Sequence, residues 1–355
     1  MELSDINVDD EWEQFMSCTG DDDVECADPE VVLSSSIANQ ECPKASDIYI
    51  STKTNISYLN QSVDLKEVFW KIPVLKYSTP AVGVVKKQMK FNSTEKAELN
   101  CIQEKLKNET CIEENVMTSI DNPMGRIKFK DIRKVSIGIC KKDVISYRSK
   151  KKSAFYNCFV IILRIKERNV FKEFHVKVFN TGKLEIPGIQ TDAVFLDVIR
   201  MVVDVLTPHM PSKVGVLLEK TETVLINSNF NCGFYINREL FFDILRNKYN
   251  IEAIYDPCSY PGIQCKFYYN KRQEIQTGVK DGHDLIDVSF MIFRTGSVLI
   301  VGKCEEVVLR IIYEFLKEIL KTEFSSVGVH IINDSTTKPK YKKTRKKTIV
   351  IENMT

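Results

Sequence analysis

The sequence lacks the features of a membrane or secreted protein. No apolar run approaches the ~18 residues needed to span a bilayer. The first five residues, Met1–Asp5, are acidic and contain neither the basic nor the apolar segment of a signal peptide. We therefore expect an intracellular protein, in the cytosol or the nucleus.

The sequence also lacks cysteines and histidines at the spacing typical of metal ligands. The eleven cysteines include no Cys-x-x-Cys pair, and the two closest pairs, Cys18/Cys26 and Cys258/Cys265, do not have zinc-ligand spacing. An odd number of cysteines argues against a complete disulfide framework, so we interpret them as reduced thiols, mostly buried as small apolar groups. The four histidines are isolated from one another. We expect no metal and no cofactor.

No catalytic constellation of paired carboxylates, Ser/His or Cys/His is evident either. The nearest approach to a metal cluster is a Gly-rich stretch, for which a solvated loop is the simpler interpretation. Its acidic and imidazole side chains are Asp281, His283, Asp284 and Asp287.

Charge is distributed very unevenly along the chain. Residues 1–30 contain twelve Asp/Glu and no Lys/Arg, whereas the whole chain has a net charge of +2. Residues 1–45 are expected to be a disordered acidic tail because they are polar and aperiodic. Residues 331–355 are expected to be a flexible basic tail, with seven basic residues between Lys338 and Lys347. A basic body suggests a polyanionic partner; a tail that only keeps the protein soluble is the alternative.

The most informative feature is an internal repeat. Val178–Gly188 and Ile292–Gly302 are identical at five of eleven positions. Each copy has Thr-Gly at its centre between apolar runs, which predicts a hairpin turn. Apolar residues at helical spacing follow each copy, over 195–206 and 308–319. Strand, turn, strand and helix occur twice, which predicts a duplicated α+β unit.

Alternation within the predicted strands assigns side chains to two faces. One face should contact the helices, through Leu184 and Ile186 in the first copy and Val298 and Ile300 in the second. The opposite face is apolar in the second copy, where no helix would cover it, so we expect a partner there. The side chains on this opposite face are Lys177, Phe179, Glu185 and Pro187 in the first copy and Met291, Phe293, Leu299 and Val301 in the second.

Other segments predict further elements. Residues 63–69 and 95–107 are predicted to be helices. Residues 126–152 contain eleven Lys/Arg and two Asp among alternating apolar residues, which indicates exposed basic strands.

The segment Tyr255–Gly262 resembles the Tyr-acid-Pro-x-x-Phe-Pro-Gly stirrup loop of the TATA-binding protein (TBP) family. The two Thr-Gly hairpins resemble that family's Phe-x-Ser/Thr-Gly-Lys hairpin. The chain is therefore similar to this family, especially to TBP-like proteins of large DNA viruses, over about 153–324 and more weakly over 48–75. The resemblance implies an α+β fold, a duplicated saddle in which a curved antiparallel sheet carries helices on its convex face.

On this resemblance the saddle covers about 46–330. Its first repeat spans about 46–210 and its second about 220–325. A basic insertion at about 77–150 interrupts the first repeat and has no counterpart that we identify in the family.

The resemblance also implies roles for individual residues. Phe179 and Phe293 match one phenylalanine of each DNA-kinking pair. Tyr260 stands where the second repeat has its other kinking ring, and Phe159 is the expected counterpart in the first repeat. Asn227 matches an asparagine that donates to base acceptors on the minor-groove floor, and its partner would fall near Thr52, which is a departure from the family.

Three further groups of residues complete the implied site. The apolar groove floor would be formed by Met291, Leu299 and Val301. Phosphate-facing cations would be Arg164, Lys183 and Lys266. Asp256, in the stirrup, is expected to contact a protein partner.

The implied function is that of a transcription initiation factor and not of an enzyme. It would bind and bend A·T-rich double-stranded DNA through the minor groove. There the family's sequence specificity depends more on how easily the DNA deforms than on hydrogen bonds to the bases. Its partners would be general transcription factors or the RNA polymerase machinery. The expected location is the nucleus or a cytoplasmic virus factory.

Two alternatives stay open. Lys177, Glu185 and Pro187 depart from the apolar or Thr residues of the family, and a carboxylate beside phosphates is unfavourable. The saddle would then be a protein-interaction scaffold of a transcription complex with weak or no specific DNA binding. Saddle-like domains are also attached to nucleases and glycosylases, which is the enzyme alternative. A separate hypothesis is that Trp12, Phe15 and Met16, among carboxylates, let the acidic tail act as a DNA mimic on the concave face.

Overall fold

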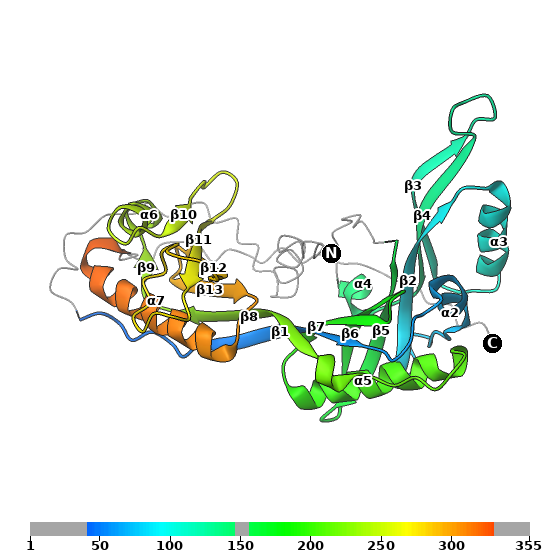
Figure 1. Cartoon of the computed structure of the whole chain (residues 1–355), viewed down its shortest axis with the longest axis horizontal. Helices are drawn as coiled ribbons and strands as arrows, with labels where there is room; N and C mark the ends of the chain where they lie inside the picture. The colour runs from blue at the N-terminus through cyan, green and yellow to red at the C-terminus, as the bar shows by residue number, and fades with distance from the viewer. Residues whose placement is uncertain (1–40, 146–155, 330–355) are drawn as a thin grey trace, which may run out of the picture.

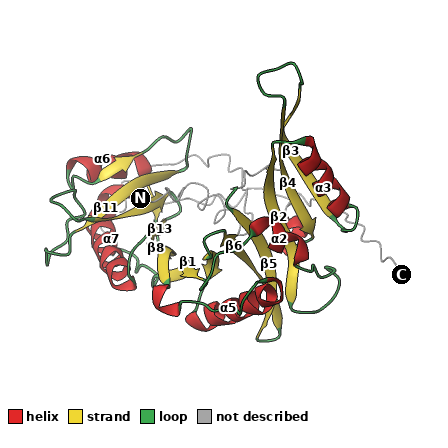
Figure 2. Ribbon diagram, turned by 45° about the vertical axis from the view of Figure 1, so that its right-hand side comes forward, coloured by secondary structure: helices red, strands yellow, loops and turns green. Residues whose placement is uncertain are grey.

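The computed structural model describes residues 41–145 and 156–329. Nearly all of the two predicted tails lies outside these residues, and so does the DNA-mimic hypothesis for Trp12, Phe15 and Met16. The described residues form one large antiparallel sheet of twelve strands, in the order β10-β11-β12-β13-β8-β1-β7-β6-β5-β2-β4-β3. Figures 1 and 2 show the sheet curving from one end of the molecule to the other. The predicted α+β class and curved antiparallel sheet are confirmed.

Two sets of elements repeat along the chain. The first set is β1 (Tyr49–Tyr58), α2 (Leu65–Lys71), β2 (Gly83–Ser93), β5 (Cys158–Glu167), β6 (Val170–Phe179), β7 (Lys183–Ile189) and α5 (Asp192–Leu206). The second set is β8 (Glu222–Asn231), α6 (Arg238–Asn247), β10 (Glu252–Ile254), β11 (Gly262–Tyr269), β12 (Ile286–Phe293), β13 (Ser297–Gly302) and α7 (Glu306–Val327). The two sets meet where β1 pairs with β8. Smaller elements are the 3₁₀ turns Thr207–His209 and Leu218–Lys220 and the short pair β9 (Tyr235–Ile236) and β14 (Gly328–Val329).

The hairpin turns of the two sets are built alike. The amide of Gly182 donates to the carbonyl of Phe179 at 3.0 Å, and the amide of Gly296 donates to the carbonyl of Phe293 at 3.0 Å. Both glycines have positive φ, +81° and +79°. A Cβ at Gly182 would overlap the carbonyl oxygen of Gln61, after β1, and a Cβ at Gly296 would overlap that of Phe234, after β8. Glycine is therefore required at both turns by conformation and by space.

Helices α2, α5, α6 and α7 lie on one face of the sheet, where the core forms. Leu184, Ile186, Val298 and Ile300 are fully buried, as the alternation predicts. The first pair belongs to a core cluster with α2 and α5, and the second pair to a cluster with α6 and α7. Thr191, four residues before the Phe195 with which the predicted helical pattern begins, caps α5 by accepting from the amide of Val194. Figure 1 shows α5 and α7 along the same side of the molecule.

Four extra elements separate β2 from β5 in the first repeat. They are α3 (Lys96–Leu106), β3 (Ile112–Asp121), β4 (Phe129–Gly138) and α4 (Lys141–Ile145). Because β2 pairs with β5 as β10 pairs with β11, β2 belongs to the repeat. The extra elements therefore begin after Ser93, which corrects the predicted insertion start at residue 77.

The prediction of exposed basic strands at 126–152 is also wrong for β4. This strand lies between β2 and β3, and its residues Ile132, Val135 and Ile137 are buried. The guanidinium of Arg133 is buried as well and donates to both oxygens of Asp131, at 2.6 and 2.8 Å. A paired arginine can be accommodated inside a sheet in a way that an unpaired one cannot.

Cysteine chemistry agrees with the sequence for the described residues. All nine described cysteines are free, and five of them are buried. Burial raises the pKa of Cys140, Cys158 and Cys232 to about 11. These thiols are therefore protonated at neutral pH and serve as packing groups. No helix within the described residues is both long and apolar enough to cross a membrane.

Candidate nucleic-acid interface

The face of the second repeat opposite its helices carries a row of apolar side chains. Met291 on β12 pairs directly with Leu299 on β13, and Val301 and Leu225 extend the row. These four side chains are only 4–9% exposed, yet none belongs to the helix-facing core clusters. The sheet of the second repeat is thus apolar on both faces, as the sequence predicts. We refer to Leu225, Met291, Leu299 and Val301 as the apolar floor.

Two aromatic rings stand at one end of the apolar floor. The rings of Tyr260 and Phe293 lie edge to face with centroids 6.0 Å apart. Gly262 lies against both rings, and a Cβ there would come within 3.1 Å of each. The absence of a side chain at Gly262 lets the two rings stand together. Their partial exposure leaves ring edges available to a partner.

The loop that carries Tyr260 is shaped by Asp256. The carboxylate of Asp256 accepts from the hydroxyl of Ser259 and from the amide of Cys258, and these bonds lower its pKa. The carbonyl of Asp256 accepts from the amide of Tyr260 at 2.9 Å. Asp256 therefore sets the position of the Tyr260 ring. The carboxylate itself is exposed, so contact with a protein partner stays a proposal.

Asn227 lies on the same face, where the two repeats meet. Its side-chain amide donates to the hydroxyl of Thr52 at 3.2 Å across the β1–β8 pair. The pairing Thr52↔Asn227 is mirrored by Thr54↔Leu225, which makes Thr54 the equivalent of Asn227 in the first repeat. Thr54 is two residues from the predicted position. A side-chain amide has two donor hydrogens, so one remains after the contact with Thr52.

The first repeat holds an ion pair at the position of the apolar pair. Lys177 on β6 pairs with Glu185 on β7, as Met291 pairs with Leu299 in the second repeat. The Lys177 ammonium and the Glu185 carboxylate are 2.5 Å apart, with side chains 28% and 12% exposed. The Glu185 carboxylate on the helix-free face is therefore neutralised within the protein. The two halves of this face have opposite chemistry at matched positions.

The extra segment around α4 covers more of the first repeat on this face. Asp143 accepts from the buried ammonium of Lys86 at 2.9 Å. The backbone amide of Lys141 donates to Glu173 at 2.7 Å. Cys140 packs with Val85 and Ile162 in a small cluster separate from the main core. Figure 1 shows α4 on the other side of the sheet from α5. The outer part of the first repeat is thus closed by its own chain.

The chain has limited similarity to known proteins. No family model matches the chain. A TATA-box-binding protein-like protein of Acanthamoeba polyphaga mimivirus is 21% identical over 205 residues, which are 53% of this chain and 54% of that protein. The chain thus spans about half the length of the curated relative it matches. The structure of Methanococcus jannaschii TBP aligns over 98% of its own length and 77% of this chain, with a TM-score of 0.37 and 13% identity.

In sequence, the chain is therefore similar to a viral TBP-like protein. The two Thr-Gly hairpins found in the sequence occupy matching places in the two repeats, and the structure adds the β1–β8 junction between the repeats.

The strand register corrects one predicted ring. Phe159 is fully buried in the helix-facing core, where its ring centroid is 6.2 Å from that of Phe69, so it cannot act as a wedge. Cys158 pairs with Phe179 as Gly262 pairs with Phe293. Two residues before Cys158 stands Tyr156, as Tyr260 stands two residues before Gly262. Tyr156 is 49% exposed, and the Lys90 ammonium lies 3.9 Å from its ring centroid.

The signal for Tyr156 was present in the sequence. Tyr156-Asn157-Cys158 and Tyr260-Pro261-Gly262 share a tyrosine two residues before a small residue that begins a strand. Without the strand pairing, however, the nearest phenylalanine was the more obvious choice.

The three cations predicted to contact phosphates lie in different environments. Arg164 is only 6% exposed, donates to the carbonyls of Tyr77 and Thr79 at 3.0 and 3.2 Å, and pairs with Glu173. It holds a loop of the protein, so its predicted contact with phosphate is wrong. Lys183 lies 5.3 Å from the centroid of the Phe179 ring. Lys266 forms a half-exposed ion pair with Asp287 at 3.3 Å, which is weak enough to exchange for a phosphate.

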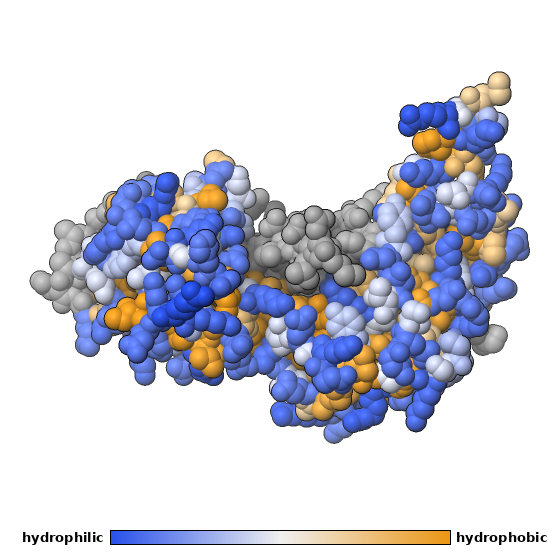
Figure 3. Space-filling model, in the orientation of Figure 1, coloured by the Kyte–Doolittle hydropathy of each residue, from blue (hydrophilic) through white to orange (hydrophobic). Residues whose placement is uncertain are grey.

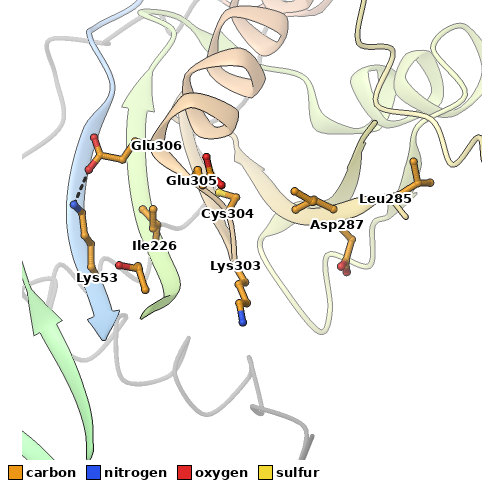
Figure 4. A pocket seen from close by; sticks show the side chains of 10 residues that line it. Lys53, Ile226, Leu285, Asp287, Lys303, Cys304, Glu305 and Glu306 are labelled. Carbon is orange, nitrogen blue, oxygen red and sulfur yellow. Dashed lines mark hydrogen bonds and ion pairs between the residues drawn. The ribbon is translucent and has the colours of Figure 1, made fainter. Parts of the chain in front are cut away.

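A cleft of about 700 Å³ lies between β1, β8 and the start of α7 (Figure 4). Lys53 and Glu306 form an ion pair across it at 2.6 Å. Cys304 also lines this cleft. Burial raises the pKa of the Cys304 thiol to about 11, so the thiol is a poor nucleophile.

The described residues contain no group of three metal-ligating side chains. Asp287 is paired with Lys266, and Asp284 lies 3.6 Å from Arg272. These ion pairs give Asp287 and Asp284 a structural role in the Gly-rich stretch.

Proposed function

We propose that the chain binds A·T-rich duplex DNA through the minor groove and bends it during transcription initiation, with the second repeat making most of the contact. The observation that supports this most directly is the apolar floor ending at the Tyr260–Phe293 pair. An apolar sheet face widens a minor groove, and rings at its end can enter a base step. Asn227 would donate to the acceptors that A·T pairs present there.

The first repeat contributes a different surface on this proposal. Tyr156 and Phe179 would be its ring pair, and Lys183 would face a phosphate. The Lys177–Glu185 pair offers DNA neither apolar area nor net charge. We infer that the first repeat contacts DNA mainly at its rim. General transcription factors or the RNA polymerase machinery would then bind elsewhere on the saddle, including at Asp256.

A binding titration tests the proposal. We expect tighter binding to A·T-rich duplexes that contain TA steps than to G·C-rich duplexes, because TA steps kink easily. If five to eight phosphates are neutralised, log affinity should fall against log salt with a slope of roughly −5 to −7. Fluorescence anisotropy at two or more salt concentrations measures both quantities. A flat salt response, or no binding to any duplex, would contradict the proposal.

The second candidate function is a protein-interaction scaffold. It is favoured by the segment around α4, which closes part of the first repeat's face through the Lys86–Asp143 and Lys141–Glu173 contacts. A scaffold would keep the saddle for protein contacts and would show no preference between the duplexes in the titration.

A further inference from the structure

The β3–β4 hairpin, which we call the arm, ends in a rigid turn. The side chain of Asn122 accepts from the amide of Met124 at 3.2 Å, and the carbonyl of Asn122 accepts from the amide of Gly125 at 3.0 Å. The amide of Asn122 donates across the base of the turn to the carbonyl of Lys128 at 2.8 Å. Pro123 fixes its own φ at the second position of this turn. Pro123 and Met124 are therefore held at the apex, and Met124 is 96% exposed.

Cations surround this apolar apex. Arg126, Lys128 and Lys130 follow it within six residues, and no carboxylate lies between Asn122 and Lys130. The acidic residues on either side are already neutralised by the protein. Asp121 pairs with Lys96 at 2.9 Å, and Asp131 pairs with Arg133 at 2.6 Å. Figure 3 shows apolar and hydrophilic atoms side by side at the upper end of the arm.

The arm extends well beyond the neighbouring strands of the sheet. Met89 on β2 pairs with Phe159 near the start of β5 and also with Val135 on β4. From Val135 to the start of β4 at Phe129 is six residues, which span about 20 Å in a strand. Figure 1 shows the arm rising at the end of the molecule away from the second repeat, on the side opposite α5. The tip therefore projects past the edge of the helix-free face and does not cover that face.

We propose that the arm is a second DNA-binding element, which inserts Pro123 and Met124 into the minor groove of duplex next to the sheet's own site, while Arg126, Lys128 and Lys130 contact phosphates. This inference rests on the proposed function and adds a separate site to it. A small apolar wedge flanked by cations on a β-ribbon is a chemistry suited to a minor groove. The charge of the tip is complementary to phosphates and has no internal counter-ion among its described neighbours.

Replacing the three cations tests the phosphate contacts. The variant Arg126→Ser/Lys128→Ser/Lys130→Ser should bind an A·T-rich duplex carrying long flanks with a salt slope smaller by about 2 to 3, at about 0.9 per lost contact. Between 50 and 200 mM salt, the fall in its affinity should then be roughly 40-fold smaller than that of the unaltered chain. The matched control, Arg200→Ser/Arg310→Ser/Lys321→Ser, removes three exposed cations from the helices α5 and α7 and should keep the original slope.

Met124→Ser tests the wedge separately, because it leaves every charge in place. A 2-aminopurine base placed in the flank should brighten when the unaltered chain binds, since it becomes unstacked. With Met124→Ser the increase should be lost while the salt slope stays the same. Trimming the flank on the arm's side should abolish the difference between the triple variant and the unaltered chain.

The outcomes separate the two proposals. If the unaltered chain binds and bends DNA but the arm variants match it in salt slope and flank fluorescence, the arm inference is wrong and the proposed function stands. If the unaltered chain binds no duplex, both are wrong. If the triple variant instead loses affinity for an acidic protein partner and not for DNA, the arm is a protein-docking element and the inference is again wrong.

Discussion

The two repeats use one backbone design for two different surfaces. Their hairpin turns, glycines and helix-facing residues match position by position, whereas the helix-free faces diverge. The second repeat places Met291 against Leu299 where the first places Lys177 against Glu185. The comparison shows that the helix-facing core constrains the fold, while the other face is free to change chemistry. A duplicated fold can therefore keep the same shape in both halves while their helix-free faces differ in chemistry.

The largest expected difference between the halves concerns their rings. Phe293→Ala or Tyr260→Ala should weaken DNA binding by roughly ten- to a hundredfold, because a stacked aromatic ring contributes about 1–3 kcal/mol. Phe179→Ala should cost much less, since no apolar floor adjoins it. Bend angle, measured by energy transfer between end-labelled strands, should fall in the same order. Equal losses in both halves would show that a conventional saddle tolerates the Lys177–Glu185 pair.

Replacing first-repeat residues by their second-repeat equivalents tests the difference between the halves directly. Lys177→Met/Glu185→Leu reproduces the Met291–Leu299 pair without changing net charge. We expect roughly tenfold tighter binding to A·T-rich DNA, because apolar area replaces an ion pair that would have to be desolvated on contact. Stability should change by no more than about 1 kcal/mol, because the pair is partly exposed.

A matched control isolates the effect of position. Lys317→Met/Glu314→Leu removes a comparable ion pair from the exposed face of α7 and should leave DNA affinity unchanged. Affinity and melting temperature of the two double variants provide the comparison. Tighter binding by both variants, or by neither, would mean that the ion pair on the groove face does not set the difference between the halves.

A smaller difference should appear in the pH dependence of folding. Burial, together with the nearby cations Lys142, Lys86 and Lys177, lowers the pKa of His175 to about 4. The unfolded ring takes up a proton near pH 6.5 and the folded ring does not, so stability is lost as the pH falls from about 6.5 towards 4. We expect a loss of about 1–3 kcal/mol from this half-buried ring.

The equivalent position in the second repeat is Ser289. His175→Ser should therefore flatten the slope of unfolding free energy against pH, as measured by urea denaturation. An unchanged slope in His175→Ser would show that other groups account for the acid sensitivity.

The sequence predicted best what depends on local periodicity. Alternation placed Leu184 and Val298 on the helix-facing side because a strand with helices on one face must repeat every two residues. Helical spacing located α5 and α7 for the same kind of reason. The Thr-Gly turns were recognisable because only glycine fits their backbone.

The errors concern contacts between distant segments. Phe159 was chosen over Tyr156 because the extra elements between β2 and β5 remove the spacing that links the stirrup to its neighbouring strand. Arg164 looked like a free cation because its acceptors, the carbonyls of Tyr77 and Thr79, are more than eighty residues away in the chain. Periodicity carries no information about such partners. The ion pair between Lys177 and Glu185 was likewise hidden until the strand register was known.

The extra elements also have a consequence for the order in which the chain can fold. In the second repeat, seven residues separate β10 from β11, whereas 64 residues separate β2 from β5. Closing the longer connection costs about 2 kcal/mol more in chain entropy before any of its own structure forms. Contacts between neighbouring segments form faster than contacts between distant ones. The second repeat is therefore the half that can assemble early and offer β8 as a template, against which β1 and the slower first repeat are then added.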